Sequence, residues 1–459
     1  MILKIENLGV IKSAQVDLSK KLTVFCGGNN TGKTYASYII QAFLTEDGVF
    51  NVIPSYVSVI QQFKETLQFR VTRQVVEEWL VSNCHAVKSQ LESIFGISET
   101  TRRNLFGKFD ISVEYGDDEF QDLLDSEFRT TVQYGSSMWN AVKTKGSDAV
   151  KFENCTGISS DGIDIMLMTR VVSVAIHRLV YGNMLGVRML TVERNSIYTF
   201  KTELSLSRNE LIDQIQQSDK SEFDILGFIN KSSRRYPQAI RSSLRIANDL
   251  ENVQKFNSKF AIVAEMIEKN LLKGEVSMTK NGDVEFHAGN MSKMKRLPFH
   301  LSSSIVKTMA SLVIYLRHLA NRGDVLIIDE PEMNFHPDVQ VLLTRIFAIL
   351  VSRGIHVLIS THSDYIIREL NNLIMAGTVC RRNNEADHLA VQTLGYSDEM
   401  VIDSSDISVL CFKNKGKRTV TVESVTVEED GFAVESIDNT IIEQNKRAEE
   451  LYSILIEDK

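Results

Sequence analysis

The sequence predicts an α/β fold with a mostly parallel central sheet, antiparallel strands at the N-terminus and a large, mainly helical inserted lid. Three short apolar runs, at 3–5, 14–18 and 22–26, alternate with turn residues, and the third runs directly into a glycine-rich segment followed by helical spacing. In the last third of the chain, strand and helix patterns alternate, which is typical of a parallel sheet. Long helical patterns of mixed charge separate these two regions.

The same patterns divide the chain into four parts. An Asn-Gly pair within 275–286 predicts a hairpin turn, because these residues accept positive φ. The predicted parts are a first core lobe at 1–50, an inserted lid at 51–187 with a strand-rich patch, a second part of the core at 188–376, and C-terminal strands with a helix at 377–459.

Composition narrows the class of protein. A content of 43% hydrophobic and 24% charged residues is ordinary for a globular chain, and a net charge of −8 argues against non-specific coating of nucleic acid. The absence of a signal-like start and of a long uncharged apolar run predicts a cytoplasmic protein without membrane contact. The five cysteines form no Cys-x-x-Cys pair and have no histidine at the usual ligand spacing, so the sequence predicts neither a zinc site nor disulfides.

The glycine-rich segment matches the phosphate-binding pattern G-x-x-x-x-G-K-[ST]. Its backbone N–H groups and the following helix N-terminus suit a phosphate, the lysine suits the β- and γ-oxygens of ATP, and the hydroxyl of Thr34 suits Mg²⁺. The predicted nucleotide-binding residues are Gly27, Asn29, Asn30, Thr31, Gly32, Lys33 and Thr34.

A second motif is an apolar run that ends in Asp329 and Glu330. A buried strand that delivers two carboxylates to its C-terminal edge suits Mg²⁺ binding by Asp329 and activation of water by Glu330 as general base. His362 follows the next predicted strand and is expected to reach the same edge, where it would contact the γ-phosphate of ATP.

These motifs, in this order, resemble the ABC-type ATPases. The run Pro331-Glu332-Met333-Asn334-Phe335-His336-Pro337 is similar to the one in the non-transporter branch with RecF-like, SMC-like and OLD-like proteins. The resemblance implies a signature segment that binds ATP held by a partner subunit, and hence a head-to-tail homo-oligomer. Ser302, Ser303 and Ser304 occupy its place, where the usual pattern has Ser-Gly-Gly. Gln61 and Gln62 are candidates for the family's Q-loop by position.

The serine-rich signature, the compact insertion and the segment after Thr361 look most like the PtuA family of Septu anti-phage ATPases. This resemblance implies a regulatory ATPase that controls a separate HNH nuclease of the PtuB type and meets DNA through that nuclease. Neither an HNH nor a TOPRIM pattern occurs in the chain itself.

Three alternatives remain open. One is a RecF/SMC-like repair ATPase that acts on DNA directly, and another is the ATPase subunit of a PARIS-type defence complex with a TOPRIM effector. The third is a nucleotide-gated oligomeric scaffold whose hydrolysis is vestigial. A basic stretch is formed by Lys231, Arg234, Arg235, Arg241 and Arg245. It is either a DNA groove or else a solvated helix face or an acid-base contact between subunits, and the single aromatic beside it disfavours the DNA groove.

Overall fold

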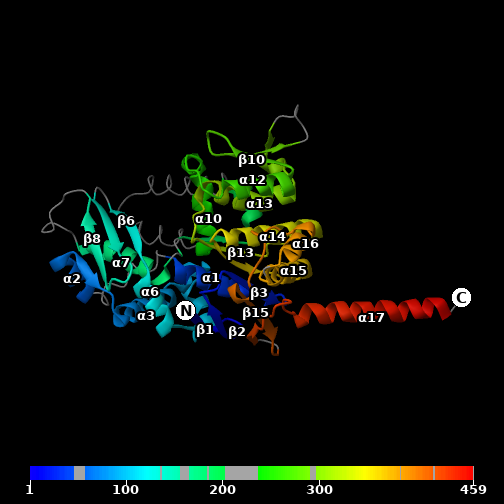
Figure 1. Ribbon diagram of the computed structural model, residues 1–459, viewed down its shortest axis with the longest axis horizontal. Helices are drawn as coiled ribbons and strands as arrows, with labels where there is room; N and C mark the ends of the chain where they lie inside the picture. Colours follow the sequence, from blue (N-terminus) through cyan, green and yellow to red (C-terminus); the bar gives the residue numbers. More distant parts are fainter. Residues whose placement is uncertain are drawn as a thin grey trace.

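The computed structural model describes residues 1–45, 57–134, 137–155, 165–182, 184, 186–201, 236–289, 296–382, 384–416 and 419–457. Figure 1 shows the lid at one end of the molecule, the central sheet and its covering helices in the middle, and a long C-terminal helix leading away at the other end. The sequence also predicts a helix at 205–217, which lies outside the described residues.

A sheet of nine strands forms the centre, in the order β5-β1-β2-β16-β15-β3-β14-β13-β9. From β15 to β9 each strand pairs parallel with its neighbour, whereas β5, β1 and β2 pair antiparallel with one another. This confirms the predicted fold class. In chain order the strands are β1 (Ile2–Leu8), β2 (Ile11–Asp17), β3 (Leu22–Gly27), β5 (Asp110–Glu114), β9 (Val187–Leu190), β13 (Val325–Asp329), β14 (His356–Ser360), β15 (Ile407–Asn414) and β16 (Val420–Val425).

The sheet separates two hydrophobic cores. Successive side chains of a strand point to opposite faces, so Val24 and Phe25 enter different cores, as do Ile327 and Ile328. Both β3 and β13 are buried along their whole length because helices cover each face of the sheet. This explains why their sequences read as uninterrupted apolar runs.

Two segments outside the predicted core lobes also supply strands of this sheet. In the C-terminal part, β15 pairs with β3 and β16 pairs with β2, so this part lies in the middle of the sheet. From the predicted lid, β5 pairs with β1 at the edge. Apolar residues of β15 such as Val409 and Phe412 are fully buried, so the C-terminal segment completes the core.

The rest of the lid is a four-stranded antiparallel sheet wrapped by helices. Phe63, Trp139 and Phe152 pack together in its centre, with ring centroids of Phe63 and Phe152 4.7 Å apart. Asn83 of the lid donates a 2.7 Å hydrogen bond to the carbonyl of Phe43, which ties the lid to the helix after β3. The lid elements are α2 (Val57–Thr66), β4 (Gln68–Arg70), α3 (Arg73–Ser89), α4 (Leu91–Phe95), α5 (Glu99–Phe106), α6 (Asp117–Asp125), β6 (Phe128–Tyr134), β7 (Ser137–Lys143), β8 (Ala149–Asn154) and α7 (Ile165–Tyr181).

Further helices and a small sheet cover the other face of the central sheet. The predicted hairpin is present, and Gly282 in its turn has φ 77°. The elements are α10 (Gln238–Asn248), α11 (Leu250–Val253), α12 (Ala261–Ile267), β10 (Gly274–Met278), β11 (Val284–Ala288), β12 (Leu297–Pro298), α13 (Ser304–Ile314), α14 (Pro337–Ser352), α15 (Asp364–Cys380) and α16 (Glu385–Thr393), with π-helical turns at Glu268–Leu272 and Tyr315–Leu319.

The chain ends in α17 (Glu435–Glu457), which projects from the body (Figure 1). Its apolar residues Ile442, Leu451 and Leu455 are exposed. Within the described residues, no helix combines the length and apolar character needed to cross a membrane.

Candidate nucleotide-binding site

The loop between β3 and α1 (Lys33–Leu44) has the shape that a phosphate-binding loop requires. Gly27, Asn30 and Gly32 all have positive φ, at 125°, 59° and 90°. A side chain at Gly27 would place its Cβ 2.4 Å from the carbonyl oxygen of Phe412 in β15, so glycine is required there for packing as well as for conformation. Gly28, Asn29 and Asn30 are open to solvent at the tip of the loop.

The lysine of the loop is buried beneath this tip. The Nζ of Lys33 donates hydrogen bonds to the carbonyls of Gly28 at 2.8 Å and Gly27 at 3.2 Å, and lies 3.4 Å from the hydroxyl of Thr31. Burial lowers the pKa of Lys33, while the carboxylates of Asp329 and Glu330 oppose this shift. The ammonium is therefore desolvated and aimed at the loop interior, the position from which it can bind a phosphate oxygen.

Thr34, the first-turn hydroxyl of α1, meets Asp329 at the end of β13. Its Oγ1 donates a 2.7 Å hydrogen bond to one carboxylate oxygen of Asp329, and the hydroxyl of Ser360 donates to the other. Asp329 and Ser360 are register partners on neighbouring parallel strands, so both reach the same edge of the sheet. A hydroxyl and a carboxylate are oxygen donors that suit Mg²⁺.

Glu330 follows in a left-handed conformation with φ 46°, which is uncommon for a residue with a side chain. Its N–H donates to the carbonyl of Ser360 at 3.0 Å, and its own carbonyl accepts from Arg194 at 2.7 Å. The surrounding hydrogen bonds hold this backbone geometry, which costs about 1–3 kcal/mol. It turns the Glu330 carboxylate to 4.0 Å from Nε2 of His362, and both side chains remain partly exposed.

Arg194 stabilises this turn through hydrogen bonds to its backbone carbonyls. Its Nη1 donates to the carbonyls of Asp329 at 2.6 Å and Thr191 at 3.0 Å, and only 2% of the residue is exposed. Burial lowers the pKa of Arg194 to about 10, against the opposing effect of the nearby carboxylates, with Asp329 first among them. Because Glu193 and Arg194 directly follow a strand that the sequence predicts at 190–192, they are expected near the nucleotide edge of the sheet. Only the structure shows that Arg194 holds the turn through its hydrogen bonds.

Glu332 connects this turn to His362. One carboxylate oxygen of Glu332 accepts hydrogen bonds from the backbone N–H of His362 at 2.6 Å and from the hydroxyl of Thr361 at 2.9 Å. Burial and the positive charge of Lys33 lower the pKa of His362, so its imidazole is neutral near pH 7. The role of Glu332 was missed because a motif match does not show which side chains turn inward.

The structure does not bring the predicted signature serines into this cluster. Ser302 is buried and its hydroxyl has no hydrogen-bond partner, whereas Ser303 and Ser304 are exposed at the N-terminus of α13. No hydrogen bond among the described residues joins them to the phosphate-binding loop at 27–34 (the P-loop), to Asp329 or to His362. Gln61 and Gln62 lie in α2 within the lid, where Gln61 bonds Glu65 and Gln62 accepts from the N–H of Arg70.

Only part of the predicted basic stretch lies in the described residues. Lys231, Arg234 and Arg235 lie outside them. Arg241 donates hydrogen bonds to the carbonyl and hydroxyl of Ser93 and so joins α10 to the lid. Arg241 therefore makes a packing contact within the chain, which neither the DNA-groove nor the solvated-face interpretation predicted.

Comparisons with known proteins give a family and a set of distant structural similarities. Solved SMC head domains are similar to this chain only at low TM-scores. One bound to the C-winged helix domain of ScpA has a TM-score of 0.36 and 9% identity, covering 93% of this chain and 98% of that chain. The SMC head domain from Thermotoga maritima has a TM-score of 0.31 and 8% identity, covering 93% of this chain and 98% of that chain. An SMC head domain from Pyrococcus furiosus, bound to the C-terminal domain of ScpA, has a TM-score of 0.36 and 11% identity, covering 97% of this chain and 98% of that chain. No curated protein matches.

The family comparison covers most of the chain. A model described as the AAA ATPase domain matches residues 1–367, which include the P-loop, Asp329, Glu330 and His362. The match agrees with the geometry of a nucleotide site at the carboxyl edge of a parallel sheet. The chain is a nucleotide-binding ATPase and belongs to the AAA ATPase domain family.

Proposed function

We propose that this chain binds Mg²⁺-ATP between the P-loop and the end of β13, and hydrolyses it there. The contact that carries the proposal is the 2.7 Å hydrogen bond between Thr34 and Asp329, because it unites the two halves of a magnesium site from distant parts of the sequence. Thr34 and Asp329 would hold the cation. When bound, Mg²⁺ neutralises charge on the phosphate oxygens.

Glu330 is the general base in this proposal. Its carboxylate orients a water molecule and takes the proton as the water oxygen forms its bond to the γ-phosphorus. The bond from that phosphorus to the β,γ-bridging oxygen breaks, so ADP and phosphate are the products. The partial exposure of Glu330 and its 4.0 Å approach to His362 support this role. His362, as a neutral imidazole, contacts the γ-phosphate by hydrogen bonding.

The ATP-bound state is proposed to be a head-to-tail homo-oligomer. Ser303 and Ser304 lie exposed at the N-terminus of α13, which suits contact with ATP on a second copy, since helix N-termini favour phosphates. Ser302, with its buried hydroxyl, is the least suited of the signature serines for that contact.

The biological role that we propose is that of a regulatory subunit in an anti-phage complex. ATP binding and hydrolysis in this oligomer would control a separate HNH nuclease of the PtuB type, which would itself meet the DNA. The serine-rich signature and the segment after Thr361 support this assignment through their resemblance to Septu ATPases.

The first test is steady-state turnover by Glu330→Gln. We expect kcat to fall by about 10²-fold or more while ATP binding persists, and the variant to accumulate as ATP-bound oligomer in sedimentation experiments. Glu429→Gln, which changes an exposed carboxylate near the C-terminal strands, is the control and should match the wild type. Equal turnover by wild type and Glu330→Gln would remove Glu330 from the chemistry.

A second test concerns the partner. We expect the purified chain to co-purify with an HNH protein encoded beside it and to show little DNA affinity alone. Salt-sensitive DNA binding by the chain itself, lost on charge reversal of Lys231, Arg234 and Arg235, would instead favour a RecF/SMC-like repair ATPase. A TOPRIM protein encoded beside it would favour a PARIS-type complex.

A further inference from the structure

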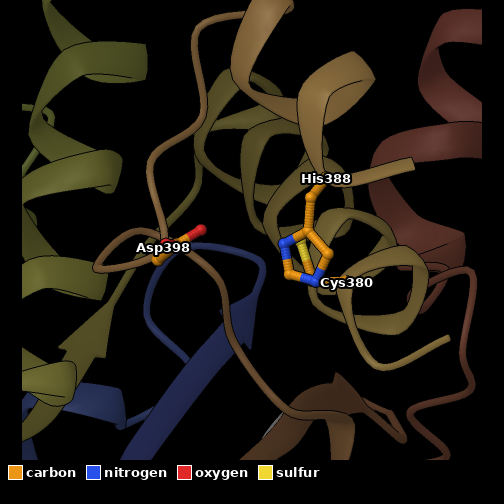
Figure 2. A group of neighbouring side chains, drawn as sticks. All are labelled: Cys380, His388 and Asp398. Atoms are coloured by element: carbon orange, nitrogen blue, oxygen red, sulfur yellow. The ribbon is translucent and has the colours of Figure 1, made fainter. Parts of the chain in front are cut away.

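A cluster of three metal-ligating side chains lies outside the nucleotide site. Cys380 ends α15, His388 lies in α16 and Asp398 lies in the turn that follows α16. One ligand atom from each lies within 4.8 Å of the other two. Figure 2 shows the imidazole of His388 beside the sulfur of Cys380, with Asp398 approaching from a different segment.

Backbone capping fixes the segments that carry these side chains. Asn384 caps α16, its side chain accepting from the N–H of Ala386 at 3.1 Å. Gly395, with φ 87°, ends the helix, and a 2.8 Å backbone hydrogen bond from Met400 to Ser397 closes the turn around Asp398. The convergence therefore rests on ordinary helix-end geometry and not on contacts among the three side chains.

The three side chains also retain their ligand capacity. Across the described part of the chain, no protein group forms a hydrogen bond or ion pair with the thiol of Cys380, the ring of His388 or the carboxylate of Asp398. Cys380 and His388 are partly buried and Asp398 is exposed, so solvent reaches the cluster from one side.

We propose that Cys380, His388 and Asp398 bind a zinc ion. Sulfur, imidazole nitrogen and carboxylate oxygen are the donors that zinc takes in proteins, and bond lengths of about 2.0–2.3 Å place the donors of one ion roughly 3–4 Å apart. Small side-chain adjustments bring the cluster within that range. Water completes the tetrahedron from the exposed side. Thiolate together with imidazole disfavours Mg²⁺ and Ca²⁺, which prefer oxygen.

The cluster lies at the end of α15 that is far from the nucleotide site. The helix α15 begins at Asp364, two residues after His362, and ends at Cys380, so its 17 residues separate the cluster from that site by about 25 Å of helix. The ion would join the end of α15 to α16 and to the turn that leads into β15. No ligand spacing in the sequence predicts this site, because its ligands come from two helices and a turn.

The test uses the full chain, stripped of metal and titrated with Co²⁺ as a spectroscopic probe. We expect one equivalent to give a thiolate-to-cobalt charge-transfer band that Zn²⁺ then abolishes. Cys380→Ser should lose the band, and His388→Ala and Asp398→Asn should bind Zn²⁺ ~10-fold or more weakly in competition with a chromophoric chelator. Zn²⁺ should also raise the thermal midpoint of the wild type but not of Cys380→Ser.

Matched controls separate the site from adventitious binding. Cys155→Ser removes an exposed thiol and His85→Ala an exposed imidazole in the lid, and both should bind like the wild type. Wild-type chain without a thiolate band, or the same affinity in Cys380→Ser and Asp398→Asn as in the wild type, would overturn the proposal. Because Asp398→Asn changes an exposed turn residue, it keeps the test decisive if Cys380→Ser folds poorly.

Discussion

The backbone N–H of His362 donates a 2.6 Å hydrogen bond to the carboxylate of Glu332. The turn after β13 and the turn after β14 are therefore joined by one partly buried side chain, which also accepts from Thr361. Movement of either turn would move the other, so the position of the His362 ring depends on the residues that follow Glu330.

Glu332→Ala should lower turnover because it leaves a buried N–H and a buried hydroxyl without acceptors. Each unsatisfied group costs about 1–3 kcal/mol, so we expect reduced stability and a kcat lowered by ~10-fold or more. Glu332→Gln keeps an acceptor oxygen and should restore most of both. Urea unfolding and steady-state kinetics check this, and a defect of equal size in Glu332→Gln would mean that charge, and not position, is what Glu332 supplies.

The pKa of Glu332 gives the same residue a pH signature. Burial raises the pKa of Glu332 above its ordinary value of 4.5, so the folded state holds its proton more tightly than the unfolded chain. The associated stability is present below pH 4.5 and is lost as pH rises through the folded pKa. Glu332→Gln should remove this loss and be relatively more stable at neutral pH than at pH 4, measured by urea unfolding at several pH values. An unchanged pH dependence would contradict it.

Arg194→Lys should be nearly as damaging as Arg194→Ala. The planar guanidinium reaches the carbonyls of Asp329, Glu330 and Thr191 at once, and an ammonium cannot reproduce that fork. We expect each variant to lose about 2–3 kcal/mol of unfolding free energy and most ATPase activity. Arg245→Lys, at an exposed position of α10, is the control for the chemical change. Wild-type turnover in Arg194→Lys would show that the turn does not need the simultaneous hydrogen bonds of a guanidinium.

How far the sequence predicts this site depends on whether a residue's role is local. The P-loop conformation follows from its own glycines, and the meeting of Thr34 with Asp329 follows from the rule that ligands bind at the carboxyl edge of parallel strands. The sequence places Arg194 near this edge but does not show its role, because the carbonyls of Asp329 and Glu330 that it binds lie far away in sequence. The convergence of Cys380, His388 and Asp398 is hidden for a different reason, because it depends on how α15, α16 and the following turn fold back on one another.

In the fold, too, features with a local cause were predictable and those that depend on distant contacts were not. Uniform apolar runs correctly predicted β3 and β13 as strands, and β13 as a buried one. The sequence did not show that β15 lies beside β3, because pairing partners of parallel strands are set by tertiary packing rather than by local pattern. The carbonyl of Phe412 in β15 faces Gly27, so the C-terminal segment shapes the P-loop itself.

Gly27→Ala tests that contact. The new Cβ would meet the Phe412 carbonyl at 2.4 Å and would require φ 125° of an alanine, so we expect a loss of about 2–5 kcal/mol and weakened ATP binding. Gly28→Ala is the matched control for folding, since its Cβ would approach only Thr31, at 3.9 Å. Chemical denaturation and binding of a fluorescent ATP analogue measure both effects. Similar stability of the two variants would mean that β15 shifts to accommodate the new Cβ with little loss of unfolding free energy.

His177 makes the stability of the lid depend on pH. Its Nε2 lies 3.0 Å from the carbonyl of Leu44, at the end of the P-loop helix, and burial lowers the pKa of His177 to about 4. Below pH 6.5 the unfolded chain accepts a proton that the folded chain refuses, so stability that is complete above pH 6.5 is lost as pH falls toward 4. The loss from this residue is about 3 kcal/mol.

His177→Gln isolates that effect from the other histidines. The amide can still donate to the Leu44 carbonyl but does not titrate, so the difference in unfolding free energy between the two proteins should change by about 3 kcal/mol between pH 6.5 and pH 4. His85→Gln, at an exposed position of α3, should follow the wild-type curve. Parallel curves for wild type and His177→Gln would show that His177 takes up its proton in the folded state, and hence that the contact between the lid and the P-loop helix opens in acid before the protein unfolds.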